Sequence, residues 1–259
     1  MRVFRGTRPL KRWRYVGVFC DELMICAASI HVGPAPQTFW AVFDRAEKRL
    51  LERTRLVPRR GALDLTPGRL RIHDDSIVLD LVLDEGTPIE ATCPHGGSYV
   101  WTRKQAGVRA QGTLSRADEP VRTIEARAVI DDTAGYHARV TEWRWAAGVG
   151  VSANGTPIAF NLVEGINDPQ TGSERAVWVA GSPHELPPVR ISEDLRSIMS
   201  PADGAELRFV PEAERHRRDN LLLVRSEYRA PFGSFAGVLP GGVEIAHALG
   251  VVEHHSARW

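Results

Sequence analysis

The chain of 259 residues contains 43% hydrophobic and 25% charged residues, which is the composition of a folded globular protein with a sizeable core. Its formal net charge of +1 argues against a dedicated nucleic-acid binder, because such proteins usually carry a basic excess. No stretch approaches the roughly 18 consecutive apolar residues that a membrane span needs. We therefore expect neither a nucleic-acid partner nor a membrane span, and the oligomeric state stays open.

The basic residues and the cysteines add two further indications. Of the 33 basic residues, three are lysines and 30 are arginines spread along the chain, which we interpret as codon bias in a GC-rich genome. The cysteines, Cys20, Cys26 and Cys93, form neither a CxxC pair nor a disulfide framework. Together with the lack of a signal-peptide pattern, this predicts a protein of the reducing cytoplasm.

Short segments with alternating or β-branched residues, separated by Gly, Pro, Asp or Asn, dominate the chain. They predict strands at residues 13–20, 23–32, 38–44, 69–74, 76–84, 99–104, 121–130, 138–145, 156–165, 174–181, 205–211, 220–230 and 242–259. Two segments have a helical character, 44–53 and 211–219. Many short strands with few short helices favour an all-β sandwich or barrel over alternating strands and helices.

The two halves of the chain show a faint internal repeat. KRWRYVGVF around Trp13 resembles TEWRWAAGV around Trp143, and each is followed by a strand that carries another tryptophan, Trp40 or Trp178. The repeat predicts two related β domains, residues 1–131 and 132–259, joined by a linker near Asp131. Chance similarity between β segments explains the pattern about equally well.

The stretch GYHARVTEWRW opens the second half and is the first candidate for a site. If all of it is a strand, His137 and Arg139 share a face with both tryptophans, Trp143 and Trp145. The match with Trp13 favours a structural role for Trp143, whereas His137 and Arg139 have no counterpart in the first half. A site on this strand is therefore expected at His137 and Arg139.

The C-terminal segment GVVEHHSARW holds the second candidate. In a strand, Glu253 and His255 lie on one face, where their polar ends can share a proton or a hydrogen bond. A structural pair in the last strand is the more common explanation. Alternation sends His254 to the opposite face and no HExxH motif is present, so we expect no metal site.

Other polar residues give weaker indications. Asn161 lies in a strand-like run, where a position beside a turn and an interior position are equally plausible, and Glu174 is expected to face solvent. The segment Cys93–Gly97 brings a cysteine, a histidine and two glycines together, and a Pro/Gly turn explains it best. There is no GxSxG elbow, phosphate loop or dinucleotide motif, so no cofactor is expected.

Taken in order, LKRWRYVGVF, TEWRWAAGVG, FNLVEG, ERAVWVAG with HELPPV, and GVVEHHSARW resemble domain-of-unknown-function family 2804 from about Trp13 to Trp259. Arg175 departs from the pattern, which has asparagine after the glutamate. The family is similar in plan to the lipocalin-like superfamily that includes carotenoid hydratase (hydroxyneurosporene synthase), tocopherol cyclase and fungal cyclases. This resemblance implies two lipocalin-like antiparallel β-barrel or sandwich domains in tandem, with a ligand in one barrel or between them.

The resemblance also implies a function. We expect binding of an apolar or amphipathic small molecule of isoprenoid, polyketide or fatty-acyl type, with cofactor-independent acid/base hydration, cyclisation or isomerisation. The residues expected to act as acid or base are Glu253, His255 and His137. The residues expected to shape the pocket are Trp143, Trp145, Arg139 and Asn161. Two alternatives stay open: a non-catalytic carrier or sensor, and a structural or interaction module without a ligand.

Overall fold

The computed structural model describes residues 1–74, 77–116, 119–221 and 224–258. Within these residues every element of regular secondary structure is a β-strand. The strands form two large antiparallel sheets and one two-stranded sheet of β1 (Phe4–Arg5) and β2 (Arg8–Pro9). The all-β fold predicted from the sequence is thereby confirmed. Ser76, residues 222–223 and Trp259, which belong to three expected strands, lie outside the described residues.

The first large sheet has the strand order β6-β5-β4-β3-β12-β11-β9-β8-β7, and β10 also pairs with β11. Its strands are β3 (Lys11–Phe19), β4 (Leu23–Val32), β5 (Ala35–Asp44), β6 (Arg49–Arg55), β7 (Leu63–Asp64), β8 (Arg69–Asp74), β9 (Ile77–Asp84), β10 (Ile89–His95), β11 (Ser98–Arg116) and β12 (Arg122–Gly135).

The second large sheet has the order β16-β15-β14-β13-β21-β20-β19-β18-β17. Its strands are β13 (Val140–Ser152), β14 (Pro157–Glu164), β15 (Ala176–Val179), β16 (Ser182–Glu185), β17 (Arg190–Ile191), β18 (Ser197–Met199), β19 (Glu206–Leu221), β20 (Val224–Leu239) and β21 (Val243–Arg258). The two orders correspond strand for strand, with β3 matching β13 and β12 matching β21. Trp13 and Trp143 therefore occupy equivalent strands, which supports the internal repeat.

Both helical predictions were wrong. Residues 44–53 form the end of β5, a turn and most of β6, and the turn contains Lys48 with a φ of 52°. Residues 211–219 belong to β19, in which buried and exposed side chains alternate. The charged residues of this segment concealed the period of two, because Arg215 and Arg217 point inward while the charges between them face solvent.

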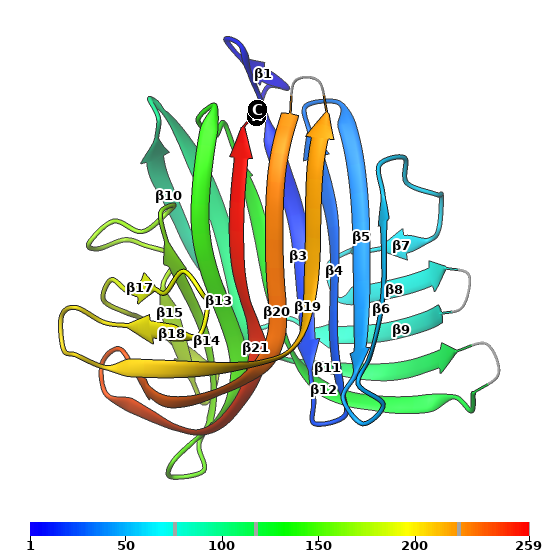
Figure 1. Cartoon of the computed structure of the whole chain (residues 1–259), viewed down its shortest axis with the longest axis vertical. Coiled ribbons are helices and arrows are strands. Elements are labelled where there is room, and N and C mark those ends of the chain that lie inside the picture. Colours follow the sequence, from blue (N-terminus) through cyan, green and yellow to red (C-terminus); the bar gives the residue numbers. More distant parts are fainter. Residues whose placement is uncertain (75–76, 117–118, 222–223, 259) are drawn as a thin grey trace.

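The strands at the centre of the molecule are buried on both faces. In β3, Val16 and Val18 belong to the apolar core of the first sheet, whereas Tyr15 and Phe19 belong to a second core. This second core also contains Trp143 and other residues of the second sheet, so it joins the two halves. In Figure 1 β7–β9 curl away to the right and β15–β18 to the left, while β3 and β21, which are in contact, lie between them.

The chain passes from one sheet to the other at residues 136–139. β12 continues without interruption through Asp131 to Gly135, and β13 begins at Val140. The expected linker near Asp131 is therefore part of a strand. A division into domains at residues 131 and 132 stays a prediction, and the border between the sheets lies a few residues later.

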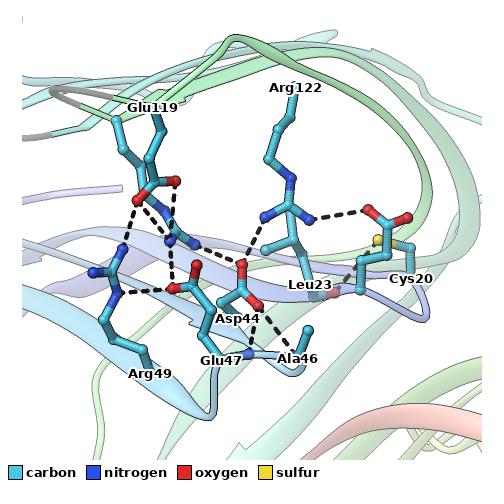
Figure 2. A network of polar contacts seen from close by, with 10 residues as sticks. Cys20, Leu23, Asp44, Ala46, Glu47, Arg49, Glu119 and Arg122 are labelled. Carbon is cyan, nitrogen blue, oxygen red and sulfur yellow. Dashed lines mark hydrogen bonds and ion pairs between the residues drawn. The ribbon is translucent and has the colours of Figure 1, made fainter.

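A polar network holds the turn after β5 against the end of β11 and the start of β12 (Figure 2). The buried carboxylate of Asp44 accepts hydrogen bonds from the guanidinium groups of Arg116 at 2.9 Å and Arg122 at 2.6 Å. Its second oxygen accepts two backbone N–H groups, those of Ala46 and Glu47, both at 3.1 Å. The network fixes the β5–β6 turn to strands that lie far away in the sequence.

Within the described residues, no helix is long and apolar enough to cross a membrane.

Candidate functional site

A cavity of about 480 Å³ lies between the two sheets. It is lined by side chains of β3, β4, β5, β11 and β12 from the first sheet and of β13, β14, β19, β20 and β21 from the second. Its polar and aromatic lining residues are Lys11, Trp13, Tyr15, Gln37, Phe39, Lys104, Asp131, Thr133, His137, Trp143, Trp145, Asn167, Glu174, Arg215, Arg217, Asp219, Ser226, Tyr228, Glu253 and His255. Five of the seven residues proposed from the sequence line this cavity.

Glu253 lies on the cavity face of β21 and is buried. Its carboxyl accepts a hydrogen bond from the indole of Trp143, with 2.8 Å between Nε1 and Oε1, and a further one from the hydroxyl of Tyr228. Burial raises the pKa of Glu253 to about 7, although both hydrogen bonds and the charge of Lys104 act in the opposite direction. The carboxyl group of Glu253 therefore gains and loses its proton near neutral pH.

His255 also faces the cavity, two residues further along β21. Its Nε2 lies 2.9 Å from the hydroxyl oxygen of Ser226, and its ring meets that of Trp143 edge-on at 4.3 Å. Burial, followed by the charge of His254, lowers the pKa of His255 to about 3. His255 is thus a neutral imidazole at pH 7, and Glu253 is the group that carries the exchangeable proton.

The first sheet contributes a similar tryptophan and carboxylate pair. Trp13 donates a hydrogen bond from Nε1 to Asp131 at 2.9 Å, and its ring stacks on that of Trp143 with centroids 6.1 Å apart and planes at 10°. Asp131 is held by Lys104, whose Nζ lies 2.7 Å away, and by the hydroxyl of Thr133 at 2.7 Å. Asp131 therefore has an ammonium partner, whereas Glu253 takes part in no ion pair among the described residues.

Lys104 joins Asp131 to a second buried carboxyl, that of Glu174, at 3.2 Å. Burial raises the pKa of Glu174 although Lys104 opposes the effect, and Asn167 donates a hydrogen bond to it at 3.0 Å. Burial alone would lower the pKa of Lys104, but the two carboxylates outweigh it and raise the pKa. The expectation that Glu174 faces solvent was wrong: it closes this end of the cavity.

His137 reaches the cavity from the segment between the two sheets. It is 1% exposed, and its ring packs at 5.4 Å from Trp13 and 5.7 Å from His95. Burial and the nearby charge of Lys11 lower the pKa of His137 well below its usual value. Burial and the charge of Arg8 lower the pKa of Lys11 itself to about 7.

The remaining sequence candidates occupy different places. Trp145 lines the cavity and donates a hydrogen bond to Asn161 at 2.7 Å, so Asn161 positions this indole from behind and does not line the cavity. Arg139 is exposed and outside the cavity wall, because β13 begins only at Val140 and the alternation of the strand does not extend to it. The structure thus does not bring Arg139 to the other candidates.

Arg175 replaces the expected asparagine and has a structural position. Its side chain is fully buried and donates to the carbonyl oxygens of Pro169 at 2.6 Å, Pro187 at 3.1 Å and Leu186 at 3.2 Å. It thereby ties together two loops beside the cavity. Its neighbour Glu174 is the residue of this pair that faces the cavity.

Several cavity residues gave no signal in the sequence analysis, in particular Lys11, Lys104, Arg215 and Tyr228. Arg215 is buried against the rings of Phe39 at 4.0 Å and Tyr228 at 5.1 Å. Lysine is rare in this chain, and two of its three lysines, Lys11 and Lys104, are buried here. The rarity of lysine in the sequence is the signal that could have drawn attention to these two residues. A buried lysine is able to release its proton and an arginine is not, so a lysine in an arginine-rich chain is a candidate for a site.

Metal ligation has no support in the side chains: the described part of the chain has no group of three or more His, Cys, Asp or Glu residues with suitable geometry. His254 and His255 lie on opposite faces of β21, as alternation predicts, and His254 contacts Glu142 at the surface.

Two lipocalin-like β units that enclose a polar and aromatic cavity define the class of this protein. The chain belongs to the family described as a domain of unknown function, DUF2804, whose model matches residues 71–259. No curated protein matches the chain by sequence.

Solved structures with the same fold include three proteins of low sequence identity. Kievitone hydratase from Nectria haematococca has a TM-score of 0.60 at 12% identity, covering 94% of this chain and 88% of that chain. A Nitrosomonas europaea protein assigned as AttH has a TM-score of 0.57 at 12% identity, covering 97% and 93%. CghA has a TM-score of 0.52 at 8% identity, covering 96% and 88%. At these identities the likeness concerns the fold.

Proposed function

We propose that the protein binds an apolar or amphipathic small molecule in the cavity between its sheets and transfers a proton to it from Glu253. The observation that carries this proposal is the buried carboxyl of Glu253, bonded to Trp143 and Tyr228, with a pKa raised to about 7. A carboxylic acid with this pKa keeps its proton long enough at neutral pH to act as a general acid.

The shape and lining of the cavity support a ligand of this kind. Its volume of about 480 Å³ falls within the range of roughly 300–1,000 Å³ that is typical of small-molecule sites. Aromatic and aliphatic side chains share the lining with many polar groups, which suits an amphipathic molecule of isoprenoid, polyketide or fatty-acyl type. One protein of the same fold is a hydratase by name. The three free cysteines fit our further proposal of a cytoplasmic location.

The proposed reaction begins when Glu253 donates its proton to an alkene or a carbonyl of the ligand. With an alkene, the electron pair of the double bond forms the new bond to hydrogen and leaves a carbocation; with a carbonyl, a lone pair of the oxygen forms this bond and leaves an oxocarbenium ion. The faces of Trp13 and Trp143 stabilise either cation. Attack by water followed by loss of a proton completes a hydration, attack by a second double bond followed by loss of a proton completes a cyclisation, and direct loss of another proton completes an isomerisation. The proton released at the end returns to the Glu253 carboxylate, and neutral His255 orients the reacting group by hydrogen bonding.

The substitution Glu253→Gln tests the proposal, because it preserves the shape of the side chain and removes the proton donor. Wild-type and variant protein are incubated with an apolar extract of the host, and bound molecules are identified by native mass spectrometry and extraction. We expect both proteins to bind the same molecule and only the wild type to convert it, with the mass of one water gained for a hydration, or an unchanged mass and a new retention time otherwise.

Two results would contradict the proposal in different ways. If both proteins return the same unchanged molecule, the protein is a carrier and not an enzyme. If neither retains a molecule, the cavity is not a ligand site. Glu244→Gln, an exposed glutamate on the same strand, is the matched control and should behave as the wild type.

A further inference from the structure

A group of basic side chains gathers where the cavity meets the segment between the two sheets. Arg8 comes from β2, Lys11 from β3, His95 from the end of β10 and His137 from residues 136–139. The turn after His95 is made by glycine: a Cβ on Gly96 would come within 2.9 Å of the Cβ of Ala138 and 3.3 Å of Nη1 of Arg8. This close approach brings the segments together and places His95 against His137.

Several nitrogen atoms of this group are buried without a hydrogen-bond partner among the described residues. They are Nη1 of Arg8, Nε2 of His95, and Nδ1 and Nε2 of His137. The His137 ring also has a contact with the backbone of Gly135. His137 is 1% exposed and lines the cavity. A buried polar group without a partner destabilises the fold, so the cluster, in which His137 faces the cavity, indicates groups that a ligand would satisfy.

The charges around His137 and His95 are of one sign. Burial lowers the pKa of His95, and the next causes are the charges of Lys11 and Arg8. For His137 the largest cause after burial that lowers the pKa is the charge of Lys11. A bound anion would reverse each of these effects, because it favours the protonated form of every group around it.

We propose that this end of the cavity binds a carboxylate of the ligand, so that the natural ligand is an apolar acid. The inference rests on the proposed function, since it takes the cavity as the ligand site. His137 donates a hydrogen bond to the carboxylate, Lys11 supplies the charge beside it, and His95 and Arg8 support His137 from behind. A hydrocarbon would leave the nitrogens of His137 unsatisfied, and a neutral alcohol would accept a hydrogen bond from His137 without balancing the positive charge of Lys11.

The position of this subsite sets the dimensions of the ligand. Lys11 and Tyr15 are four residues apart on β3, which corresponds to ~13 Å along a strand. The ring of Tyr15 lies 5.5 Å from that of Trp145, and Trp145 pairs with Glu253 across β13 and β21. A shorter route runs through Trp143, whose ring lies 6.5 Å from that of His137 and whose Nε1 donates to Glu253 at 2.8 Å, so the carboxylate of the ligand and the atom that receives the proton are separated by on the order of 10 Å at most.

A matched pair of probes tests the subsite. Dodecanoate and dodecanol, both below their micelle concentrations, are titrated against the protein loaded with the neutral dye N-phenylnaphthylamine. We expect dodecanoate to displace the dye at least about tenfold more tightly than dodecanol, as a hydrogen bond to a charged group allows. His137→Phe and Lys11→Met should each remove this preference and leave the affinity for dodecanol unchanged, whereas Lys48→Met, which removes an exposed lysine, should retain it.

A second measurement does not depend on the folding of a variant. The carboxyl of labelled dodecanoate is followed by NMR in the complex with wild-type protein, and its pKa should be lower than in water because the subsite favours the anion. A raised pKa, or equal affinity for the acid and the alcohol, would overturn the carboxylate subsite and leave the proposed function intact. If the dye binds and neither probe displaces it, the cavity does not accept an apolar chain and both proposals fail.

Discussion

Trp13 and Trp143 occupy equivalent positions, yet the carboxylates that they bond have different surroundings. Tyr15 pairs with Asp131 and Trp145 with Glu253, so each tryptophan donates to the acid diagonally across from it. Lys104 stands opposite Asp131, whereas the register places Ala230 opposite Glu253. One acid has an ammonium partner and the other has alanine, which explains why the proton is held by Glu253.

Glu253 also makes the stability of the protein depend on pH. Its pKa is 4.5 in an unfolded chain and about 7 in the fold, so the folded state binds the proton more tightly. The stability from this group is fully present below pH 4.5 and is lost as the pH rises through about 7. We expect Glu253→Gln to be more stable than the wild type at about pH 8, by roughly 3 kcal/mol at most, and to show no such gain at about pH 4.

Chemical denaturation at both pH values measures this difference. Glu244→Gln on the same strand is exposed and should have the same effect at both pH values. A gain for Glu253→Gln that is equal at low and high pH would show that packing, and not the buried proton, is responsible.

The candidate residues illustrate what single residues in a sequence reveal. Glu253, His255, Trp143 and Trp145 follow from alternation in regular strands, and all four line the cavity. Arg139 does not line the cavity. Its predicted direction relied on strand alternation, but β13 begins only at the next residue, Val140. Lys104 and Glu174 could not be linked from the sequence, since their ion pair joins residues 70 positions apart across the two sheets.

At the scale of elements, the β5–β6 turn depends on Asp44 (Figure 2). Burial alone would raise the pKa of Asp44, but the backbone of Glu47 and the guanidinium groups of Arg122 and Arg116 lower it below its usual value of 3.8. We expect Asp44→Asn to lower the free energy of unfolding at neutral pH by about 2 to 3 kcal/mol. The contribution is present above pH 3.8 and is lost as the pH falls below it, so the difference between variant and wild type should shrink there.

Thermal or chemical unfolding checks this prediction. Asp84→Asn, at an exposed position of β9, is the control and should change stability by less than about 0.5 kcal/mol. A loss for Asp44→Asn that persists unchanged under acid would show that the shape of the site matters and the ion pairs do not.

Elements were predictable where apolar and polar residues alternate in the ordinary way. β4 has its predicted range, and β3 and β5 overlap most of theirs, because their buried residues are hydrophobic apart from Lys11 and Asp44 at the strand ends. β19 was mistaken for a helical turn over part of its length because its inward residues there include arginines. A polar cavity removes the hydrophobic signal from the strands that line it, so these strands are the ones that a sequence pattern describes least well.

For the whole molecule, the shared core makes the two sheets interdependent. Tyr15, Phe19, Trp143 and Phe232 belong to one apolar cluster, so a separated half would expose a large part of it. We expect halves that are produced separately to aggregate, and halves that are produced together, divided after Ala138, to assemble and bind N-phenylnaphthylamine. Division after Asp131 cuts β12 and should give much less assembled complex.

Size-exclusion chromatography with dye binding distinguishes these outcomes. Equal assembly from both divisions would mean that residues 132–135 are not needed in the first sheet and would favour the domain border at residue 131. Separate halves that are stable and monodisperse would contradict the dependence on a shared core.

The correspondence of the two sheets limits how such a cavity is able to arise. A homodimer of one half would present the same carboxylate twice, and symmetry would force any counter-ion beside one copy to appear beside the other. Joining two copies in one chain removes this constraint, since each copy is then free to change alone. Lysine at position 104 and alanine at position 230 are such a divergence. The two walls of the cavity therefore differ, with an acid that has no ion-pair partner among the described residues on one, Glu253, and the Lys104–Asp131 ion pair on the other.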